Sequence, residues 1–403
     1  MDLFGIIYIV TLVCTIPNYT MAASSVANIL NYGAAGNGVT DDSSAFSKAW
    51  NDTCASVAEN STLLVPSGHT FLVHSIIFSG PCKPLNIFVQ LDGGIVAPNG
   101  PNEWKGSIDS LILFEKVDGL TLSGTATIDG RGKGWWDASC ARHPQLKGCY
   151  GRRPTALKLV YCTRVKLLNI HVINSPQVHV IVWNSQNVEI DTMYINSPAL
   201  SPNTDGFHIE ASTNVSVVHS IVKAGDDCIS IGDKSSYIHV RNLFCGPGHG
   251  ISIGSLGIGG SVADVHNIDV HRVHFFGTTN GVRIKTYQVG KGIVQHVTFN
   301  DLNFHHVQNP IVIDQHYCFD PHGCPDLPTA VHIDNVTYSN VVGTASSEIA
   351  LNLNCSKSAP CTNINFKEIR LKPEKPLKSI KSSCNNAHGS TTGVVKPASC
   401  LHG

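Results

Sequence analysis

The chain has 403 residues, of which 42% are hydrophobic and only 14% are charged, and its formal net charge is −1. This composition excludes an intrinsically disordered chain, and the near-zero charge excludes nucleic-acid binding through a broadly basic surface. The 36 Gly and 3 Met are typical of a β-rich protein with many turns rather than of a helical bundle or coiled coil. At about 150 residues per domain the length would suit two or three domains, although one long repeat array could also account for it.

Residues 1–23 are predicted to be a signal peptide. The apolar run from Leu3 to Thr15 is too short to span a bilayer, and small residues follow it at Ala22 and Ala23. The usual basic residue before such a run is missing, since Asp2 stands there, so a buried N-terminal strand is the alternative. No later stretch is long and apolar enough for a membrane anchor. We therefore expect a secreted, extracellular protein of the cell wall.

The next element is predicted to be a short helix that covers the first coil of the fold. Residues 40–42, Thr-Asp-Asp, are typical of a helix N-terminus. The apolar face of this helix would consist of Ala45, Phe46, Ala49 and Trp50. The preceding Gly36-Asn37-Gly38 lacks the third glycine of a dinucleotide-binding loop and follows no clear βαβ pattern, so nucleotide binding is rejected.

Short β-branched runs then recur along the middle of the chain. They begin at Val165, Val188, Val215, Ile238, Ile268 and Val297. Successive starts differ by 23 to 30 residues, which is a solenoid period. Apolar and polar residues alternate within each run, and Asn, Gly, Pro or Ser end it, which leaves no room for long helices. The prediction is an all-β, right-handed parallel β-helix with a short N-terminal capping helix. Residues 24–403 would form this single domain, with a cysteine-clipped cap from about Cys355.

The cysteine spacing indicates disulfides and an oxidising compartment. Of the 14 Cys, Cys14 would leave with the signal peptide. The predicted pairs are Cys54–Cys82, Cys140–Cys149, Cys228–Cys245, Cys318–Cys324, Cys355–Cys361 and Cys384–Cys400. Cys162 would remain as a buried free thiol, and no Cys-x-x-Cys zinc pattern is present. N-glycosylation sequons, which support secretion, begin at Asn51, Asn60, Asn214, Asn335 and Asn354.

Four short motifs fall on neighbouring repeats. They are Asn203-Thr204-Asp205-Gly206, Gly225-Asp226-Asp227, Gly248-His249-Gly250 and Arg283-Ile284-Lys285. Asp205 precedes Asp226 by 21 residues, and Asp227 precedes His249 by 22. Each interval matches one coil, so these side chains should stack at one azimuth on rungs about 4.8 Å apart. The expected cluster has three Asp, one His, one Arg and one Lys.

The two adjacent aspartates can both reach a cleft only if the backbone bends between them, and Gly225 would permit a bend. The alternative is that Asp227 turns inward and is satisfied by backbone amides. Stacked carboxylates repel one another, which raises at least one pKa and leaves a protonated acid beside ionised bases. Glycoside hydrolysis needs such a pair of groups, because one carboxyl group protonates the leaving oxygen and another activates water.

Arg283 and Lys285 have no obvious partner in the sequence pattern. An anionic sugar would satisfy them, with Arg283 gripping a carboxylate through two hydrogen bonds. The alternative is that both cations neutralise the aspartate cluster.

The four motifs, in this order, resemble the polygalacturonases, which are pectin-degrading glycoside hydrolases built on a right-handed parallel β-helix. The runs CGPGHGISIGSLG from Cys245 and NYGAAGNGVTDDSSAF from Asn31 extend the resemblance over most of the mature chain. It implies a plant-like secreted enzyme that hydrolyses α-1,4-galacturonosyl linkages of pectate. It also implies a monomer that needs no cofactor or metal and has no nucleic-acid or membrane partner.

The resemblance also implies roles for individual residues. Asp226 would be the general acid, and Asp205 and Asp227 would activate the attacking water. His249 would tune the acid. The substrate-binding residues would be Asn203, Arg283, Lys285 and Tyr287.

Stereochemistry and cleavage mode stay open at this level. Close carboxylates predict a retaining enzyme, whereas the resemblance implies inversion. Gly259-Gly260 suggests no bulky barrier in the cleft and favours endo over exo action. Trp135 and Trp136 would either stack on a distal sugar or pack in the core.

Three other functions remain as alternatives. A rhamnogalacturonan hydrolase is disfavoured by Arg283 and Lys285, which suit a uronate at the cleavage site. A pectate lyase would need calcium, which the aspartate cluster could in principle bind. A non-enzymatic pectin-binding protein would have no need of three stacked aspartates.

Overall fold

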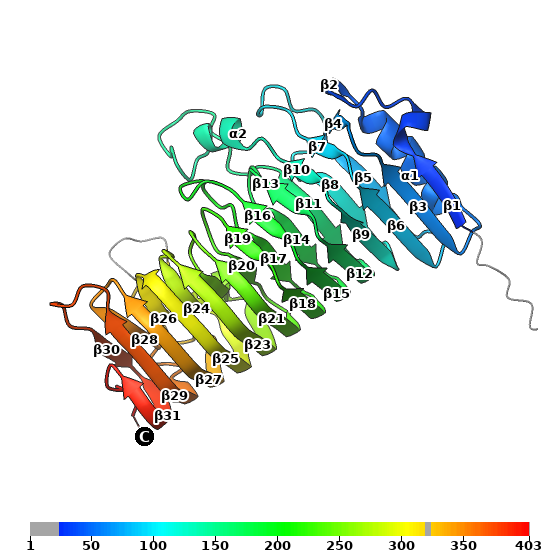
Figure 1. Ribbon diagram of the computed structural model, residues 1–403. Helices are drawn as coiled ribbons and strands as arrows, with labels where there is room; N and C mark the ends of the chain where they lie inside the picture. The colour runs from blue at the N-terminus through cyan, green and yellow to red at the C-terminus, as the bar shows by residue number, and fades with distance from the viewer. Residues whose placement is uncertain (1–23, 319–323, 403) are drawn as a thin grey trace, which may run out of the picture.

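The computed structural model describes residues 24–318 and 324–402, which form an elongated solenoid (Figure 1). Successive coils lie side by side, so the colour in Figure 1 changes steadily from the blue N-terminal end to the red C-terminal end. All strand pairs in the two sheets are parallel (for example β17 with β20), as expected when each coil repeats the direction of the one before. The predicted right-handed parallel β-helix is confirmed. The predicted signal peptide, with Cys14, lies outside the described residues.

Three columns of strands make up the walls, and two of them merge. The eleven-stranded sheet, here sheet B, consists of β5 (Ile76–Ser79), β8 (Ser110–Glu115), β11 (Thr155–Val160), β14 (Val180–Trp183), β17 (Phe207–Glu210), β20 (Ile229–Ile231), β22 (Ile251–Leu256), β24 (Asn280–Thr286), β26 (Asn309–Asp314), β28 (Ile349–Asn354) and β30 (Lys381–Asn385). The other two columns form the twenty-stranded sheet A and join at the long strand β21 (Ser236–Cys245), which pairs with a strand of each column, β18 and β19.

The longer column of sheet A contains β1 (Ser24–Asn28), β3 (Asn60–Val65), β6 (Asn86–Leu91), β9 (Leu120–Gly124), β12 (Thr163–Leu168), β15 (Gln186–Asp191), β18 (Thr213–Val218), β21, β23 (Val262–Phe276), β25 (Lys291–Val307), β27 (His332–Ala345), β29 (Cys361–Pro373) and β31 (Ala387–Lys396). The shorter column contains β2 (Asn37–Asp41), β4 (Thr70–Leu72), β7 (Gly94–Val96), β10 (Thr127–Asp129), β13 (His171–Ile173), β16 (Tyr194–Asn196) and β19 (Ile221–Lys223).

The repeat read from the sequence is the register of sheet A. Val165 pairs with Val188, and Val188 pairs with Val215. The same row then continues through Ile238, Ile268 and Val297. All six predicted repeat starts therefore occupy one row of side chains. They point inward because a strand exposes alternate residues to opposite faces.

Left-handed residues bend the chain within strands of sheet A, at equivalent places in different coils. Asn187, Asn214 and Asn267 have φ angles between 55° and 57°. Asparagine tolerates this conformation better than most residues, and its side chain can bond to a neighbour. The Asn214 Nδ2 donates to Asn187 Oδ1 at 2.7 Å, so a side-chain hydrogen bond also joins these bends in adjacent coils.

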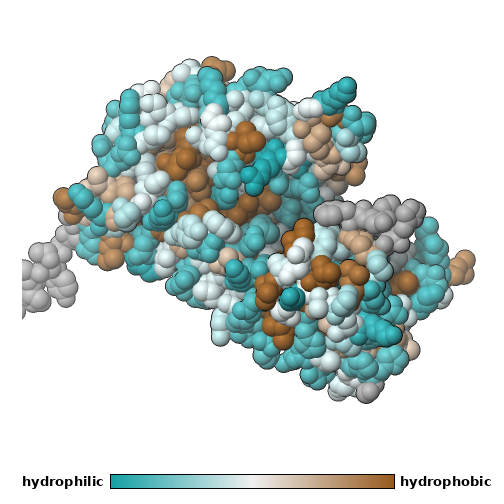
Figure 2. Space-filling view, turned by 180° about the vertical axis from the view of Figure 1, so that it is seen from behind, coloured by the Kyte–Doolittle hydropathy of each residue, from teal (hydrophilic) through white to brown (hydrophobic). Residues whose placement is uncertain are grey.

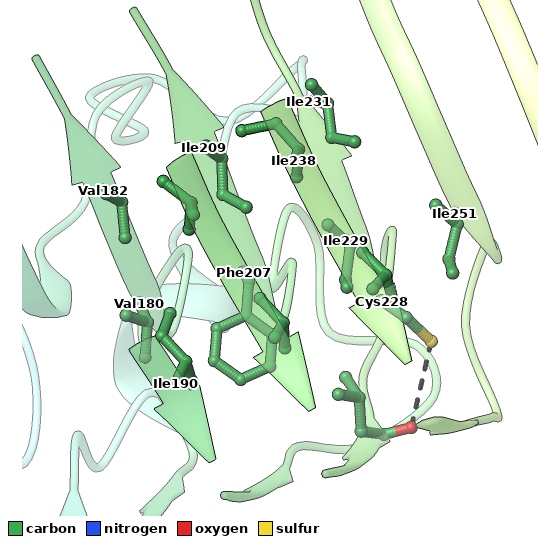
Figure 3. Close-up of a cluster of buried hydrophobic side chains, with 14 of the residues drawn as sticks. Val180, Val182, Ile190, Phe207, Ile209, Cys228, Ile229, Ile231, Ile238 and Ile251 are labelled. Atoms are coloured by element: carbon green, nitrogen blue, oxygen red, sulfur yellow. Dashed lines mark hydrogen bonds between the residues drawn. The ribbon is translucent and has the colours of Figure 1, made fainter. Parts of the chain in front are cut away.

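The core is one continuous stack of aliphatic and aromatic side chains inside the coils. Figure 3 shows the part that lies beside the central strands of sheet B, where Phe207, Ile229 and Ile251 follow one another on successive rungs. All three are fully buried. These residues support the outward-facing side chains on the same strands, because alternate residues of β17, β20 and β22 point to opposite faces.

The N-terminal helix is present as predicted. The helix α1 (Ser43–Ala55) buries Ala45, Phe46, Ala49 and Trp50 against the first coil. Asp42 does not cap the helix with its side chain but accepts bonds from the amides of Ala35 and Gly36. Asp41 instead accepts from the Ser43 amide at 3.1 Å. The other helices are short: α2 (Lys133–Asp137) and the 3₁₀ turns Ile29–Tyr32 and Ile258–Gly260.

All six predicted disulfides are formed, and Cys162 is the buried free thiol. The segment from Cys355 continues both sheets through β29, β30 and β31 rather than folding separately on the end of the stack. Figure 2 shows the molecule from behind, and on this face separate hydrophobic patches lie between hydrophilic ones. Within residues 24–318 and 324–402, the helices are all too short or too polar to cross a membrane.

Candidate active site

The predicted site residues gather in a cleft of about 580 Å³ over the middle of sheet B. The cleft walls include all eight: Asn203, Asp205, Asp226, Asp227, His249, Arg283, Lys285 and Tyr287. They come from four successive coils, because Asp205, Asp227 and His249 each stand two residues before a strand of sheet B. Arg283 and Lys285 lie within β24 itself.

The register of sheet B corrects the predicted alignment by one residue. Phe207 pairs with Ile229, and the Gly206 amide donates to the Asp227 carbonyl at 2.9 Å. Asp205 is therefore opposite Asp227, not Asp226. The spacing of 21 residues between Asp205 and Asp226 is one short of the 22-residue coil at this point.

Gly225 is required for close packing rather than for a left-handed bend. A Cβ atom at this position would lie 2.0 Å from the Ser201 carbonyl oxygen, and its φ angle is not positive. The Gly225 amide donates to Thr204 Oγ1 at 2.9 Å. The two loops that carry the aspartates are thus pressed directly against each other.

Asp227 is the buried centre of the charge cluster. Its Oδ1 accepts from Ser252 Oγ at 2.8 Å and from Arg283 at 3.0 Å, and its Oδ2 accepts from Lys285 Nζ at 3.0 Å. The side chain is only 1% exposed. The alternative in which backbone amides satisfy Asp227 is wrong, because these side chains do so. The expectation that Arg283 and Lys285 lack protein partners is also wrong.

Asp226 faces the cleft and is more accessible, with 19% of its side chain exposed. Its Oδ1 accepts from His249 Nδ1 at 2.9 Å and from the Asp227 amide at 2.8 Å. Its Oδ2 is approached only by Asn203 Nδ2, through a long hydrogen bond of 3.4 Å, among the bonds of the described residues. This oxygen is the part of the carboxyl group that remains available to a ligand.

Asp205 is held through its side chain by Ser230 and through its backbone carbonyl by His179. Its Oδ2 accepts from Ser230 Oγ at 2.7 Å, and its carbonyl oxygen contacts the buried His179 at 2.8 Å. Burial, reinforced by the negative charges of Asp226 and Asp227, raises the pKa of Asp205 to about 7. At mildly acidic pH this carboxyl group therefore carries a proton.

The pKa of Asp226 moves in the opposite direction. Burial disfavours its charge, but the hydrogen bond from His249 and the charges of His249 and Lys285 outweigh burial and lower the pKa of Asp226. The bond to Asp226 in turn raises the pKa of His249, although burial opposes it. At mildly acidic pH, Asp205 is thus protonated, and an ionised Asp226 is paired with His249.

Asp226, Asp227 and His249 offer ligand atoms within 4.8 Å of one another, as a metal site would. Every one of these groups already has a partner. His249 Nδ1 is bonded to Asp226, and both oxygens of Asp227 are bonded to cations. A calcium ion here would face the charges of Arg283 and Lys285, so the donor set does not fit one.

Sequence reasoning missed several residues of this site. His208, Ser230 and Ser252 form one outward row in register with Arg283. Tyr317 lies across from Tyr287, with ring centroids 5.3 Å apart, and the Lys285 amine is 5.4 Å from its ring centre. The row could have been found by counting 22 residues back from Ser252 and Ser230. Tyr317 comes from a loop with no repeat to mark it.

The two tryptophans pack rather than bind sugar. Trp135 is fully buried between Trp104 and Tyr150, and the Trp136 indole donates to the Ser175 carbonyl at 3.1 Å. A larger hollow of about 900 Å³ beside α2 includes Trp136, but its residues contain no stacked carboxylates. The chemistry therefore points to the smaller cleft.

The family model described as "Glycosyl hydrolases family 28" matches residues 54–400. The chain belongs to glycosyl hydrolase family 28. It is 41% identical to a probable polygalacturonase of Arabidopsis thaliana, over 92% of this chain and 83% of that protein. It is 37% identical to a polygalacturonase of Prunus persica, over 95% of both proteins. The chain is thus a glycoside hydrolase, as the resemblance of its motifs implied.

Two solved structures have the same fold. An endo-xylogalacturonan hydrolase from Aspergillus tubingensis matches with a TM-score of 0.76 and 25% identity, over 91% of this chain and all of that one. Endopolygalacturonase I from Stereum purpureum matches with a TM-score of 0.65 and 21% identity, over 85% of this chain and 97% of that one. At this identity the second match shows the fold alone.

Proposed function

We propose that this family 28 enzyme hydrolyses α-1,4-galacturonosyl linkages in de-esterified pectin. The observation that carries the proposal is the cleft itself, in which three carboxyl groups lie beside Arg283 and Lys285, with the pKa of Asp205 raised and that of Asp226 lowered. The carboxyl groups supply acid–base chemistry, and the cations suit a uronate. The polygalacturonases among its relatives support the same substrate.

Asp226 is the proposed general acid because it faces the cleft and its Oδ2 accepts only a long hydrogen bond, from Asn203, among the described residues. At mildly acidic pH, Asp205 carries a proton. An anionic sugar beside Asp226 would raise the pKa of Asp226 by like-charge repulsion and draw the proton to it. The protonated Asp226 would then donate to the leaving glycosidic oxygen, with His249 holding its other oxygen.

Asp205 and Asp227 are the proposed bases for the attacking water. Arg283 and Lys285 would bind the sugar carboxylate while they hold Asp227 in place to accept one hydrogen bond from the water. Asp205, having passed its proton to Asp226, would accept the second hydrogen bond from the water. Activity would then require one proton in the cluster, so we expect an acidic optimum and a decline above about pH 7.

We propose inversion at the anomeric carbon. The close approach of Asp226 and Asp227 would by itself suit a retaining enzyme, in which one carboxylate is the nucleophile. Both oxygens of Asp227 are engaged by cations, however, which makes it a poor nucleophile. NMR of the first product distinguishes the two: a β-anomer from the α-linkage supports inversion, and an α-anomer contradicts it.

Endo action is proposed because the cleft continues beyond the carboxylates. An adjoining hollow of about 440 Å³ shares Asp205, His208 and Glu210 with the cleft and extends over β14 toward Trp183. Tyr287 and Asn203 are proposed to line the sugar-binding subsites.

The test is the release of reducing ends measured against viscosity loss on polygalacturonic acid, with Asp226→Asn as the control. Rapid viscosity loss at few cleavages, reduced by about 10²- to 10⁴-fold in the variant, is the expected result. Steady release of single galacturonates with viscosity preserved would mean exo action. No release over pH 4 to 7 by the wild-type protein would contradict the proposed substrate.

Secretion to the cell wall is part of the proposal. The six disulfides suit an oxidising compartment. The sequons at Asn51 and Asn214 lie on exposed residues, where a glycan could be accommodated. The protein is proposed to act as a monomer without a cofactor.

A further inference from the structure

A buried arginine lies behind the proposed acid, in a part of the chain that none of the site motifs includes. Arg153 follows the loop closed by the Cys140–Cys149 disulfide and is only 3% exposed. Its guanidinium donates to Asn203 Oδ1 at 2.8 Å and to Ser139 Oγ. Its backbone amide donates to Gln177 Oε1 at 3.1 Å. Hydrogen bonds thus hold both the guanidinium and the backbone of Arg153.

The contact with Arg153 decides which way the Asn203 amide faces. An asparagine can present either its oxygen or its NH₂ group to a neighbour. Because the guanidinium is donor-only, it takes the Asn203 oxygen, and the NH₂ group is directed to Asp226 Oδ2. Asn203 also has a φ angle of 54°, a left-handed conformation that asparagine tolerates. Both backbone and side chain of Asn203 are therefore constrained.

Packing alone does not account for a charged residue at this position. Placing a guanidinium in the interior is costly, and an apolar side chain of similar volume would fill the space with less desolvation. Arg153 Nε has no hydrogen-bond partner within residues 24–318 and 324–402. Burial lowers the pKa of Arg153, and the nearby charge of Asp226 partly restores it. The arginine and the proposed acid therefore interact electrostatically.

We propose that Arg153 is a positioning residue of the active site, which orients the Asn203 amide and favours the ionised form of Asp226. This inference rests on the proposed role of Asp226 as the acid. The carboxylate that forms when Asp226 gives up its proton would be stabilised by the NH₂ group and by the buried positive charge. Other groups also act on Asp226. Its charge and that of Asp205 repel each other, and the Asp227 amide, His249 and Lys285 lower the pKa of Asp226. Arg153 would add a third positive charge to those of His249 and Lys285.

The test compares Arg153→Met with Arg152→Met, an exposed arginine at the adjacent position. In protein labelled at the aspartate carboxyl carbon and assigned with Asp226→Asn, NMR titration should show a higher pKa for Asp226 in Arg153→Met. Arg152→Met should titrate as the wild type. This readout does not require activity, so it stands even if the proposed substrate is wrong.

Kinetics on polygalacturonic acid give the second readout. We expect kcat of Arg153→Met to fall by about ten- to a hundredfold with little change in KM, since a charge-assisted bond is lost. The alkaline limb of its pH profile should move to higher pH. Arg153→Lys should recover part of the pH shift, because it keeps the charge, but not the full kcat, because it lacks the planar fork.

A double-mutant cycle with Asn203→Ala tests whether Arg153 acts through Asn203. We expect kcat of the double variant to fall by less than the product of the two single effects, because Arg153 acts in part through Asn203. Fully additive effects would contradict the orienting role. A lower melting temperature with the Asp226 titration unchanged would show that Arg153 is only structural. An inactive wild type with a shifted Asp226 titration would contradict the substrate but not this inference.

Discussion

Asp227 in the cleft of sheet B and Asp269 on the outer face of sheet A occupy similar ladders but different environments. Asp269 accepts from Arg241 at 3.0 Å and lies 3.9 Å from His239, and 30% of its side chain is exposed. Asp227 also pairs with two cations, at 3.0 Å each, but is 1% exposed. The ion-pair distances of 3.0 Å are the same at both residues, so these distances do not distinguish the two environments.

The difference between the two regions is the depth at which the charges lie. Water screens the exposed pair, so it contributes little to stability. The loops around the cleft exclude water from Asp227, so its charge depends on Arg283 and Lys285, and theirs on it. The same kind of parallel stacking therefore gives a solvated charge pair on the outer face of sheet A and a buried charge cluster over sheet B.

The largest expected effect comes from removing the buried carboxylate. Asp227→Asn should lower the free energy of unfolding by about 3–5 kcal/mol, because Arg283 and Lys285 would lose their counter-ion within the protein. Asp269→Asn is the matched change on the outer face and should cost less than about 1 kcal/mol. Denaturant unfolding of both variants makes the comparison. Equal costs would mean that depth does not separate the two regions.

A smaller effect is expected from the pH dependence of Asp205. Because its pKa is raised in the folded state to about 7, its contribution to stability is complete below about pH 4 and is lost as the pH rises through 7. The wild type should lose about 2 kcal/mol of unfolding free energy between pH 5 and pH 8 through this group. Asp205→Asn, which mimics the protonated acid, should remove that loss and be the more stable protein at pH 8. A slope unchanged from the wild type would contradict the raised pKa.

The smallest effect concerns the exposed pair of Arg241 and Asp269. Arg241→Met should change the free energy of unfolding by less than about 1 kcal/mol at low salt, and the difference should vanish in 1 M NaCl, where charges are screened within about 3 Å. Arg283→Met should keep its larger cost at both salt concentrations, because its partner Asp227 is buried. A salt-independent effect at Arg241 would show that the outer face resembles the cleft.

The sequence alone predicted the fold and eight of the residues that line the cleft. The repeat from Val165 to Val297 matches the observed register, because strand alternation is a local property that the order of residues records directly. The six disulfides join cysteines close in sequence or about one coil apart, so spacing could predict them. The cluster of Asp205, Asp226, Asp227 and His249 follows from the same periodicity.

Only the tertiary structure decided how the charges in that cluster are used. The one-residue offset between Asp205 and Asp226 depends on loop lengths that periodicity does not record. The pairing of Asp227 with both cations depends on burial, which is set by several loops together. Arg153 reaches Asn203 across 50 positions of sequence, through a loop that does not repeat. The sequence thus determined that the motif residues meet in one cleft. The low-dielectric environment made by non-local packing determined their protonation and their hydrogen-bond partners.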